Sequence, residues 1–330
     1  MSTSYEFIIP FAVVSPENNP NISLDQEGQV AAYYRAAVTC FASIRRFDSE
    51  SKLTFLSNAQ VPSKYQTIFT RIDVECREVQ FLHSPPPGFS ATFQGSLFLL
   101  DSLRYLQSDI SVIIDPDVIF FRDCKEDIDN HTAIGVLEMK YSSRRKVNGL
   151  SRRDQGDLHR LLGGANDIPK HFGGEFYVIP QSLVEDVLSR TKKAWDFSIE
   201  RSVGGLTHFN TEEHVLNWTF SGLPLYSLES VTRRVWTAHS YRNTKRNDFS
   251  LSAWHLPAEK ARGFDTLYSF FMRDSALFLT ESTPDFVQRV AKAMGIRSRT
   301  PKRLFFDLVG PIARYRRIIA SQISRVAQDR

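Results

Sequence analysis

The first 125 residues alternate short apolar stretches with segments of helical periodicity, and this alternation limits the possible folds more than any other feature. The apolar stretches that we expect to be strands cover residues 5–14, 52–57, 74–81 and 110–114. The segments with helical spacing of apolar residues cover 25–47, 61–70 and 90–107. Strands that alternate with helices predict an α/β domain with a mainly parallel central sheet flanked by helices. Ligands of such sheets bind at the carboxyl ends of the strands.

The most informative of these strands, residues 110–114, runs directly into Asp115-Pro116-Asp117. In an extended chain residues i and i+2 point to the same side, so we expect the two carboxylates to converge. Pro116 disfavours a helical Asp115, and we therefore expect an extended segment here and no turn. Adjacent carboxylates repel each other unless a cation lies between them. Hard oxygen ligands suit Mg²⁺ or Mn²⁺, with a diphosphate bridged by the metal. Alternatively, one Asp caps a turn and the other faces solvent.

The basic residues of the chain are concentrated near its end. The formal net charge is +4, but residues 289–330 hold eleven Lys or Arg and two Asp, which leaves −5 for residues 1–288. Apolar side chains lie between these basic residues, a composition typical of helices on anionic lipid headgroups. The alternative is a helical pair that packs on the body and leaves a basic face in solvent. We predict a domain over residues 1–280 and a basic amphipathic helical extension over 281–330, and no nucleic-acid partner, because no recognition motif accompanies the charge.

Other features concern the location of the protein. The N-terminal residues show neither a basic leader nor a cleavage site, and the longest apolar runs are far shorter than a bilayer requires. The three cysteines have no paired spacing and are expected to stay reduced. We therefore expect a cytoplasmic protein, which the basic extension would hold at the inner face of the membrane.

The acidic pair, placed after an apolar strand about one third of the way along the chain, resembles the DxD motif of nucleotide-sugar glycosyltransferases of the GT-A fold. The resemblance covers residues 5 to about 270. It implies metal-dependent transfer of a sugar from a UDP- or GDP-linked donor to a hydroxyl of a glycan or lipid-linked acceptor, as in surface glycan synthesis. Asp115 and Asp117 would hold Mn²⁺ or Mg²⁺, and Asp115 and Arg104 would also contact the donor.

The segment His171-Phe172-Gly173-Gly174-Glu175 resembles a second signature of these enzymes, a small-residue turn that enters a strand beside the donor sugar. Paired glycines let a backbone approach a ligand closely. Gly173 and Gly174 would therefore contact the donor, and Glu175 would accept hydrogen bonds from sugar hydroxyls. The alternative is an ordinary bulge or turn before a strand.

Residues 210–217, NTEEHVLN, resemble the segment DQDxLN of glycosyltransferase family 8. Glu212 and Glu213 stand where that family has Asp and Gln, and His214 replaces the second Asp. The resemblance implies that the anomeric configuration is retained, with Glu212 or Glu213 stabilising the oxocarbenium-like charge. Thr211 could equally cap a helix whose first-turn acids complement its dipole, and both interpretations can hold together.

Two histidines compete as the third metal ligand. His255, with Lys260 five residues later, resembles the family 8 ending HxxGxxKPW, in which His binds the metal and Lys the diphosphate, although the spacing is one residue short. His239 with Lys245 keeps the family spacing but lacks the Pro-Trp that should follow. We favour His255.

Two other functions remain open. A DxD at a strand end also serves phosphohydrolases, in which the first Asp is a nucleophile and the second a general acid. Those enzymes generally carry the motif on their first strand, whereas here about 110 residues precede it. The third hypothesis is a non-catalytic sugar-nucleotide binding protein attached to the membrane by the basic extension.

Overall fold

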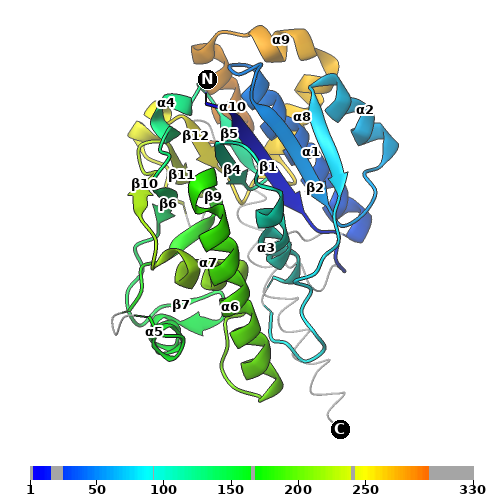
Figure 1. The fold of residues 1–330 in the computed structure, drawn as a ribbon. Helices are drawn as coiled ribbons and strands as arrows, with labels where there is room; N and C mark the ends of the chain where they lie inside the picture. Colours follow the sequence, from blue (N-terminus) through cyan, green and yellow to red (C-terminus); the bar gives the residue numbers. More distant parts are fainter. Residues whose placement is uncertain (1–2, 16–24, 92, 165–167, 239–241, 297–330) are drawn as a thin grey trace.

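The computed structural model describes residues 3–15, 25–91, 93–164, 168–238 and 242–296. A seven-stranded sheet forms its centre, with the strand order β10-β6-β9-β4-β1-β2-β3 (Figure 1). These strands are β1 (Tyr5–Phe11), β2 (Lys52–Ser57), β3 (Val74–Glu78), β4 (Ile110–Ile114), β6 (Ile134–Glu138), β9 (Phe172–Pro180) and β10 (Leu225–Ser227). Strand β9 runs antiparallel to both its neighbours, and the other pairs are parallel. The predicted mainly parallel α/β sheet is confirmed.

Helices cover both faces of this sheet. The longer ones are α1 (Gln26–Arg45), α2 (Ser63–Arg71), α5 (Arg152–Leu161), α6 (Val184–Val203), α7 (Glu212–Phe220), α8 (Gly263–Arg273) and α10 (Thr283–Ala293). The shorter ones are η2 (Gln94–Leu97), α3 (Phe98–Ser102), η3 (Leu103–Tyr105), α4 (Lys125–Ile128), η4 (Gln181–Leu183), η6 (Arg246–Ser250) and α9 (Ser275–Thr280). None of the helices in the described part of the chain is both long enough and apolar enough to cross a bilayer.

The segment expected to be one helix, residues 90–107, is helical only over 94–105, where the 3-10 segments η2 and η3 adjoin the short α-helix α3 without a gap. Ser96 and Ser102 bond their hydroxyls to the carbonyls of Phe93 and Leu99, at 2.8 and 2.6 Å. Such local bonds from serine to the backbone compete with regular helix, and Gly95 lowers its stability further. Apolar periodicity alone therefore overestimated the length of this helix.

The strands place alternate residues on opposite faces of the sheet. In β1, Phe7 and Ile9 pack in the core formed with α1, α2 and α8, whereas Ile8 packs in the core formed with α3, α6 and α7. Figure 1 shows α1 and α8 on one side of the sheet and α3, α6 and α7 on the other. The carboxyl ends of β1, β2 and β4 share one edge because these strands are parallel and adjacent.

A second, three-stranded sheet has the order β11-β12-β5, formed by β11 (Thr232–Arg234), β12 (Ala253–His255) and β5 (Val118–Phe120). Strand β5 begins directly after the acidic pair, so this sheet joins the acidic pair to residues more than 100 positions later. Residues 140–171, expected to be a loop or a helical insertion, contain α5 and a hairpin of β7 (Lys146–Val147) and β8 (Leu150–Ser151). The hairpin turns at Asn148 and Gly149, both with positive φ (47° and 90°), as a two-residue turn requires.

The division of the chain near residue 280 stays a prediction. The first helix beyond it, α10, buries Phe286 and Val290 completely in the same core as α1 and α8. The rest of the expected basic extension, residues 297–330, lies outside the described residues.

Candidate active site

The acidic pair forms a turn at the carboxyl end of β4. The amide of Val118 donates to the carbonyl of Asp115 at 3.2 Å, and Pro116 and Asp117 are the central residues of the turn. The expectation of an extended segment without a turn was therefore wrong. Proline fixes φ near the value required at the second position of a common β-turn, and its restriction on the preceding residue does not oppose a turn, because Asp115 is the first residue of the turn.

The two carboxylates nevertheless converge, and His255 joins them. Asp115, Asp117 and His255 each offer a ligand atom, and these three atoms all lie within 4.8 Å of one another. His255 pairs in register with Val118 across β12 and β5, and the amide of Leu256 donates to the carbonyl of Asp117 at 2.9 Å. The Nε2 atom of His255 is 3.4 Å from Asp115 Oδ2 and 3.3 Å from Asp117 Oδ2. The other histidine candidate, His239, lies outside the described residues.

Lys260 completes this group. Its ammonium is largely buried and forms an ion pair with Asp117 Oδ2. Sequence reasoning had placed Lys260 on the donor diphosphate, and the structure brings it to the same carboxylate that would hold the metal. A cation in this position can meet an anionic ligand of the metal as well as Asp117.

The environment of the two aspartates drives their pKa values apart. Burial disfavours the charged form of Asp117, but the charges of Lys260 and His255 outweigh burial and hold its pKa well below the ordinary value. Desolvation and the charge of Asp117 raise the pKa of Asp115 to about 6. For His255, burial opposes the charged form, but the carboxylates of Asp117 and Glu175 prevail and raise its pKa to about 9.

These residues fit a divalent cation. Within the described part of the chain, the buried atom Asp117 Oδ1 and both ring nitrogens of His255 have no hydrogen-bond partner. Buried polar atoms are normally bonded, and two carboxylates with one imidazole form a donor set of the kind that binds Mn²⁺ or Mg²⁺. Asp115 is 42% exposed while Asp117 is fully buried, so the group opens to solvent on the side of Asp115.

Glu175 lies behind this group in β9 and is fully buried. Both its oxygens meet the guanidinium of Arg234, with Nε donating to Oε1 at 2.9 Å and Nη2 to Oε2. Its Oε1 is also 3.4 Å from Nδ1 of His255. Both oxygens of Glu175 therefore already meet cationic groups of the protein. Its expected role, to accept hydrogen bonds from sugar hydroxyls, stays a prediction.

The paired glycines make room for carboxylates. A Cβ on Gly173 would overlap the carboxylate of Glu175 and lie 3.0 Å from Arg234 Nη2. A Cβ on Gly174 would lie 3.1 Å from Glu212 Oε1 and 3.2 Å from Glu213 Cγ. Close approach was expected at these glycines, and the groups that approach in this structure are acidic side chains of the protein itself.

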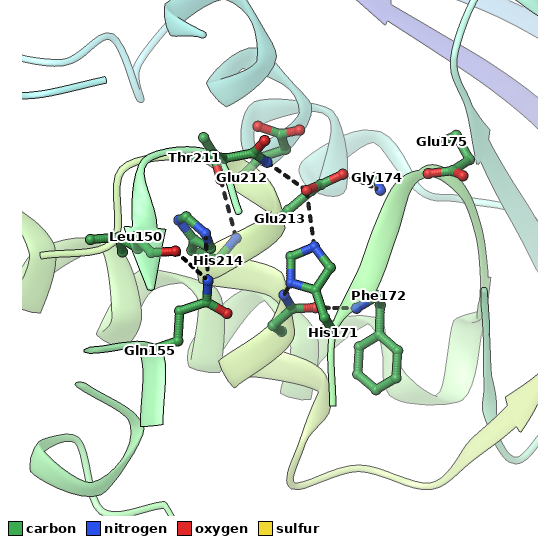
Figure 2. A network of polar contacts seen from close by, with 12 residues as sticks. Leu150, Gln155, His171, Phe172, Gly174, Glu175, Thr211, Glu212, Glu213 and His214 are labelled. Carbon is green, nitrogen blue, oxygen red and sulfur yellow. Dashed lines mark hydrogen bonds and ion pairs between the residues drawn. The ribbon is translucent and has the colours of Figure 1, made fainter. Parts of the chain in front are cut away.

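The first turn of α7, which carries Glu212 and Glu213, lies against the start of β9 at Gly174 (Figure 2). Thr211 caps α7 by accepting from the amide of His214, as expected. Glu213 is buried and accepts from the amide of Gly174 at 3.0 Å and from Asn148 Nδ2 at 2.6 Å. It also meets His171 Nε2 at 3.2 Å and Arg234 Nη2 at 3.1 Å. Glu213 is therefore held from four directions.

Glu212, one residue earlier, is partly exposed and accepts a hydrogen bond from Ser96 of η2. Burial and the charge of Glu213 raise the pKa of Glu212 to about 8. Burial also opposes the charged form of Glu213, but His171 and Arg234 outweigh it and hold its pKa well below the ordinary value. Burial lowers the pKa of His214 to about 3, so this residue is a neutral partner of Gln155, at 3.2 Å.

Two predicted donor contacts are not brought to this group. Arg104 is exposed in η3, which leads to the amino-terminal end of β4, opposite the end that carries Asp115. Lys245 is exposed at the start of η6. Both residues remain predictions as donor contacts.

Sequence reasoning missed Arg234, Ser96 and Asn148. The only sequence signal for Arg234 was the arginine doublet Arg233-Arg234 followed by Val235 and Trp236, which does not indicate a buried ion pair. Asn148 precedes Gly149, which signals a hairpin turn, but its contact with Glu213 depends on how the hairpin packs.

Comparison with known proteins supports this architecture. No protein-family model matches the sequence, and no curated protein matches it. Among solved structures, the chain is similar to the galactosyltransferase LgtC in complex with donor and acceptor sugar analogues, with a TM-score of 0.52, 13% identity, and coverage of 80% of this chain and 95% of LgtC. It is also similar to the apo structure of the bifunctional glycosyltransferase WbbM, with a TM-score of 0.50, 13% identity, and coverage of 91% of this chain and 52% of WbbM.

Proposed function

Since the chain has the GT-A fold of these glycosyltransferases, we propose that it is a metal-dependent glycosyltransferase, similar to family 8. It would move a sugar from a UDP- or GDP-linked donor to a hydroxyl of a glycan or lipid-linked acceptor, with retention of configuration. The observation that carries this proposal is the convergence of Asp115, Asp117 and His255, with Lys260 beside them, at the carboxyl end of β4.

The roles of the residues follow from the geometry. A divalent cation held by Asp115, Asp117 and His255 would supply Lewis-acid charge beside the donor diphosphate. Lys260, next to Asp117, would donate a charge-assisted hydrogen bond to a diphosphate oxygen. Glu213 is already held by four partners, whereas Glu212 is partly exposed. Glu212, whose ionised form a bound cation would favour, is therefore the better candidate to stabilise positive charge at the anomeric carbon, and Glu213 is the better candidate to hold the site together.

The partners are proposed on chemical grounds. A metal site with an adjacent ammonium suits the diphosphate of a nucleotide sugar, and LgtC was solved with donor and acceptor sugar analogues. The excess of basic residues over 289–330 supports attachment to an anionic membrane surface, which would bring a lipid-linked acceptor within reach.

Thermal-shift measurements with UDP-, GDP- and CMP-sugars, each with and without Mn²⁺, test this proposal, because a ligand of the folded state raises its apparent stability. We expect stabilisation by one donor class only when Mn²⁺ is present. Asp117→Asn should lose that shift and the turnover of the donor, whereas Asp123→Asn, a change at an exposed aspartate, should retain both. Metal-dependent transfer by Asp117→Asn, or release of phosphate from simple esters without any response to sugar nucleotides, would refute the proposal.

A further inference from the structure

We propose that Arg234 is the positioning residue of this site. Through Glu175 it orients His255 for the cation, and through Glu213 it ties the metal side of the site to the sugar side. This inference rests on the proposed function, because it concerns how the chain prepares the same metal site.

The backbone of the small sheet places Arg234 next to His255. The two residues are directly paired in the parallel ladder of β11 and β12, and the amide of Val235 donates to the carbonyl of His255 at 2.8 Å. On its other side, His255 pairs with Val118, the residue that follows Asp117. Arg234, His255 and the acidic turn are thus neighbours across one short sheet, and their spacing is set by backbone hydrogen bonds.

The side chain of Arg234 binds two buried carboxylates. Its Nε and Nη2 donate to Oε1 and Oε2 of Glu175, and Nη2 also donates to Glu213 Oε1 at 3.1 Å. The two carboxylates belong to different elements, β9 and α7. A planar guanidinium that meets a carboxylate with two nitrogens fixes its orientation as well as its distance, which an ammonium cannot do.

Glu175 passes this orientation on to the metal site. Its Oε1 lies 3.4 Å from His255 Nδ1, an ion-pair contact outside hydrogen-bond geometry, on the far side of the ring from the Nε2 atom that faces the aspartates. Its backbone carbonyl accepts the amide of Asp115 at 3.0 Å. A histidine ligand usually presents its second nitrogen to a carboxylate, which sets the tautomer and the direction of the ring. Because Arg234 holds both oxygens of Glu175, that carboxylate cannot turn away from His255.

The surroundings leave space for the guanidinium. A Cβ on Gly173 would lie 3.0 Å from Arg234 Nη2, so any other residue at this position would press on the contact with Glu175. On the opposite side, Glu213 is fixed by Gly174, His171 and Asn148 independently of Arg234. Arg234 therefore bridges the small sheet to β9 and α7, and since Glu213 keeps its other partners, we expect a change at Arg234 to affect His255 first.

Binding of Mn²⁺ to the whole protein tests the inference. The free Mn²⁺ signal in electron paramagnetic resonance gives the Kd, and the ¹⁴N coupling in electron spin echo envelope modulation reports ligation by histidine. We expect Arg234→Lys and Glu175→Gln to weaken Mn²⁺ binding by about 10- to 100-fold and to change the ¹⁴N coupling. His255→Gln gives the reference for lost ligation. The matched control is Arg233→Lys on the same strand. The guanidinium of Arg233 meets Asp248 and the carbonyl of Asn243, so this variant should keep the wild-type Kd within about threefold.

The outcomes separate this inference from the proposed function. If wild-type protein binds Mn²⁺ and Arg234→Lys keeps its Kd and ¹⁴N coupling, the positioning role is refuted and the metal site stands. Equal losses in Arg234→Lys and Arg233→Lys, with the ¹⁴N coupling unchanged in both, would show a structural role alone and would also refute it. If wild-type protein binds no Mn²⁺, the proposed function and this inference fail together. If circular dichroism shows that Arg234→Lys does not fold, Glu175→Gln, which keeps Arg234, tests the inference instead. A wild-type Kd and ¹⁴N coupling in Glu175→Gln would then refute it.

Discussion

The surroundings of the Glu212 carboxyl group disfavour its ionisation, which lowers the free energy of unfolding near neutral pH. A substitution that removes the ionisable group should restore this free energy by a measurable amount. Burial and the adjacent charge of Glu213 raise its pKa to about 8. An unfolded glutamate ionises near pH 4.3. In the folded protein the group binds its proton more tightly, so its contribution to stability is complete below about pH 4.3 and is lost as the pH rises toward 8.

The change Glu212→Gln replaces the protonated acid with a neutral amide of the same shape. Between pH 4.3 and pH 7 the cost of the acid accumulates at about 1.4 kcal/mol per pH unit, which sets an upper limit of about 3–4 kcal/mol. Water screens part of this cost because the side chain is partly exposed, so we expect Glu212→Gln to raise the free energy of unfolding by about 1–3 kcal/mol at pH 7.

Urea unfolding at pH 5, 7 and 8.5, in a buffer that chelates divalent cations, measures this effect. Chelation matters because a bound cation would favour the ionised acid. The gain should be small at pH 5 and largest at pH 8.5. Glu200→Gln, at an exposed position of α6, should stay within about 0.5 kcal/mol of wild type at each pH. A gain that does not vary with pH, or a loss of stability at pH 8.5, would refute the reasoning. Glu212→Gln should also lose transfer activity, because a neutral amide cannot stabilise positive charge at the anomeric carbon. A gain in stability with a loss of activity is common at sites that perform chemistry.

Two further predictions concern the metal side of the site. Lys260→Met leaves His255 as the cation beside Asp117, so the metal-free protein should lose up to about 3–5 kcal/mol in urea unfolding. Mn²⁺ affinity should rise because no ammonium competes for Asp117, and weaker Mn²⁺ binding in this variant would contradict the assigned geometry. Mn²⁺ must also displace the proton of His255, whose pKa is about 9 in the metal-free protein, so affinity should rise by about tenfold per pH unit between pH 6.5 and 8.5. Calorimetric titrations check this slope, which His255→Gln should abolish.

The sequence by itself determined the features that depend on neighbours along the chain. Apolar periodicity follows directly from the geometry of strands and helices, and it predicted the parallel sheet and the strand that ends at Asp115. The acidic pair was recognisable because both carboxylates lie within three residues of one another. Even locally, competing tendencies led to errors, since Pro116 initiates a turn and the helix expected over residues 90–107 covers only 94–105 and is partly 3-10.

The tertiary structure alone decided which distant side chains complete the site. The structure brings the favoured His255 to Asp115 and Asp117, but its neighbour Glu175 is 80 residues earlier in the chain, and Arg234 lies 59 residues from Glu175. Which of these side chains meet depends on the register of β11, β12 and β5 and on the space left by Gly173. Periodicity carries no information on register between strands that are far apart in sequence. A buried ion pair is recognisable only once packing has removed both charges from water.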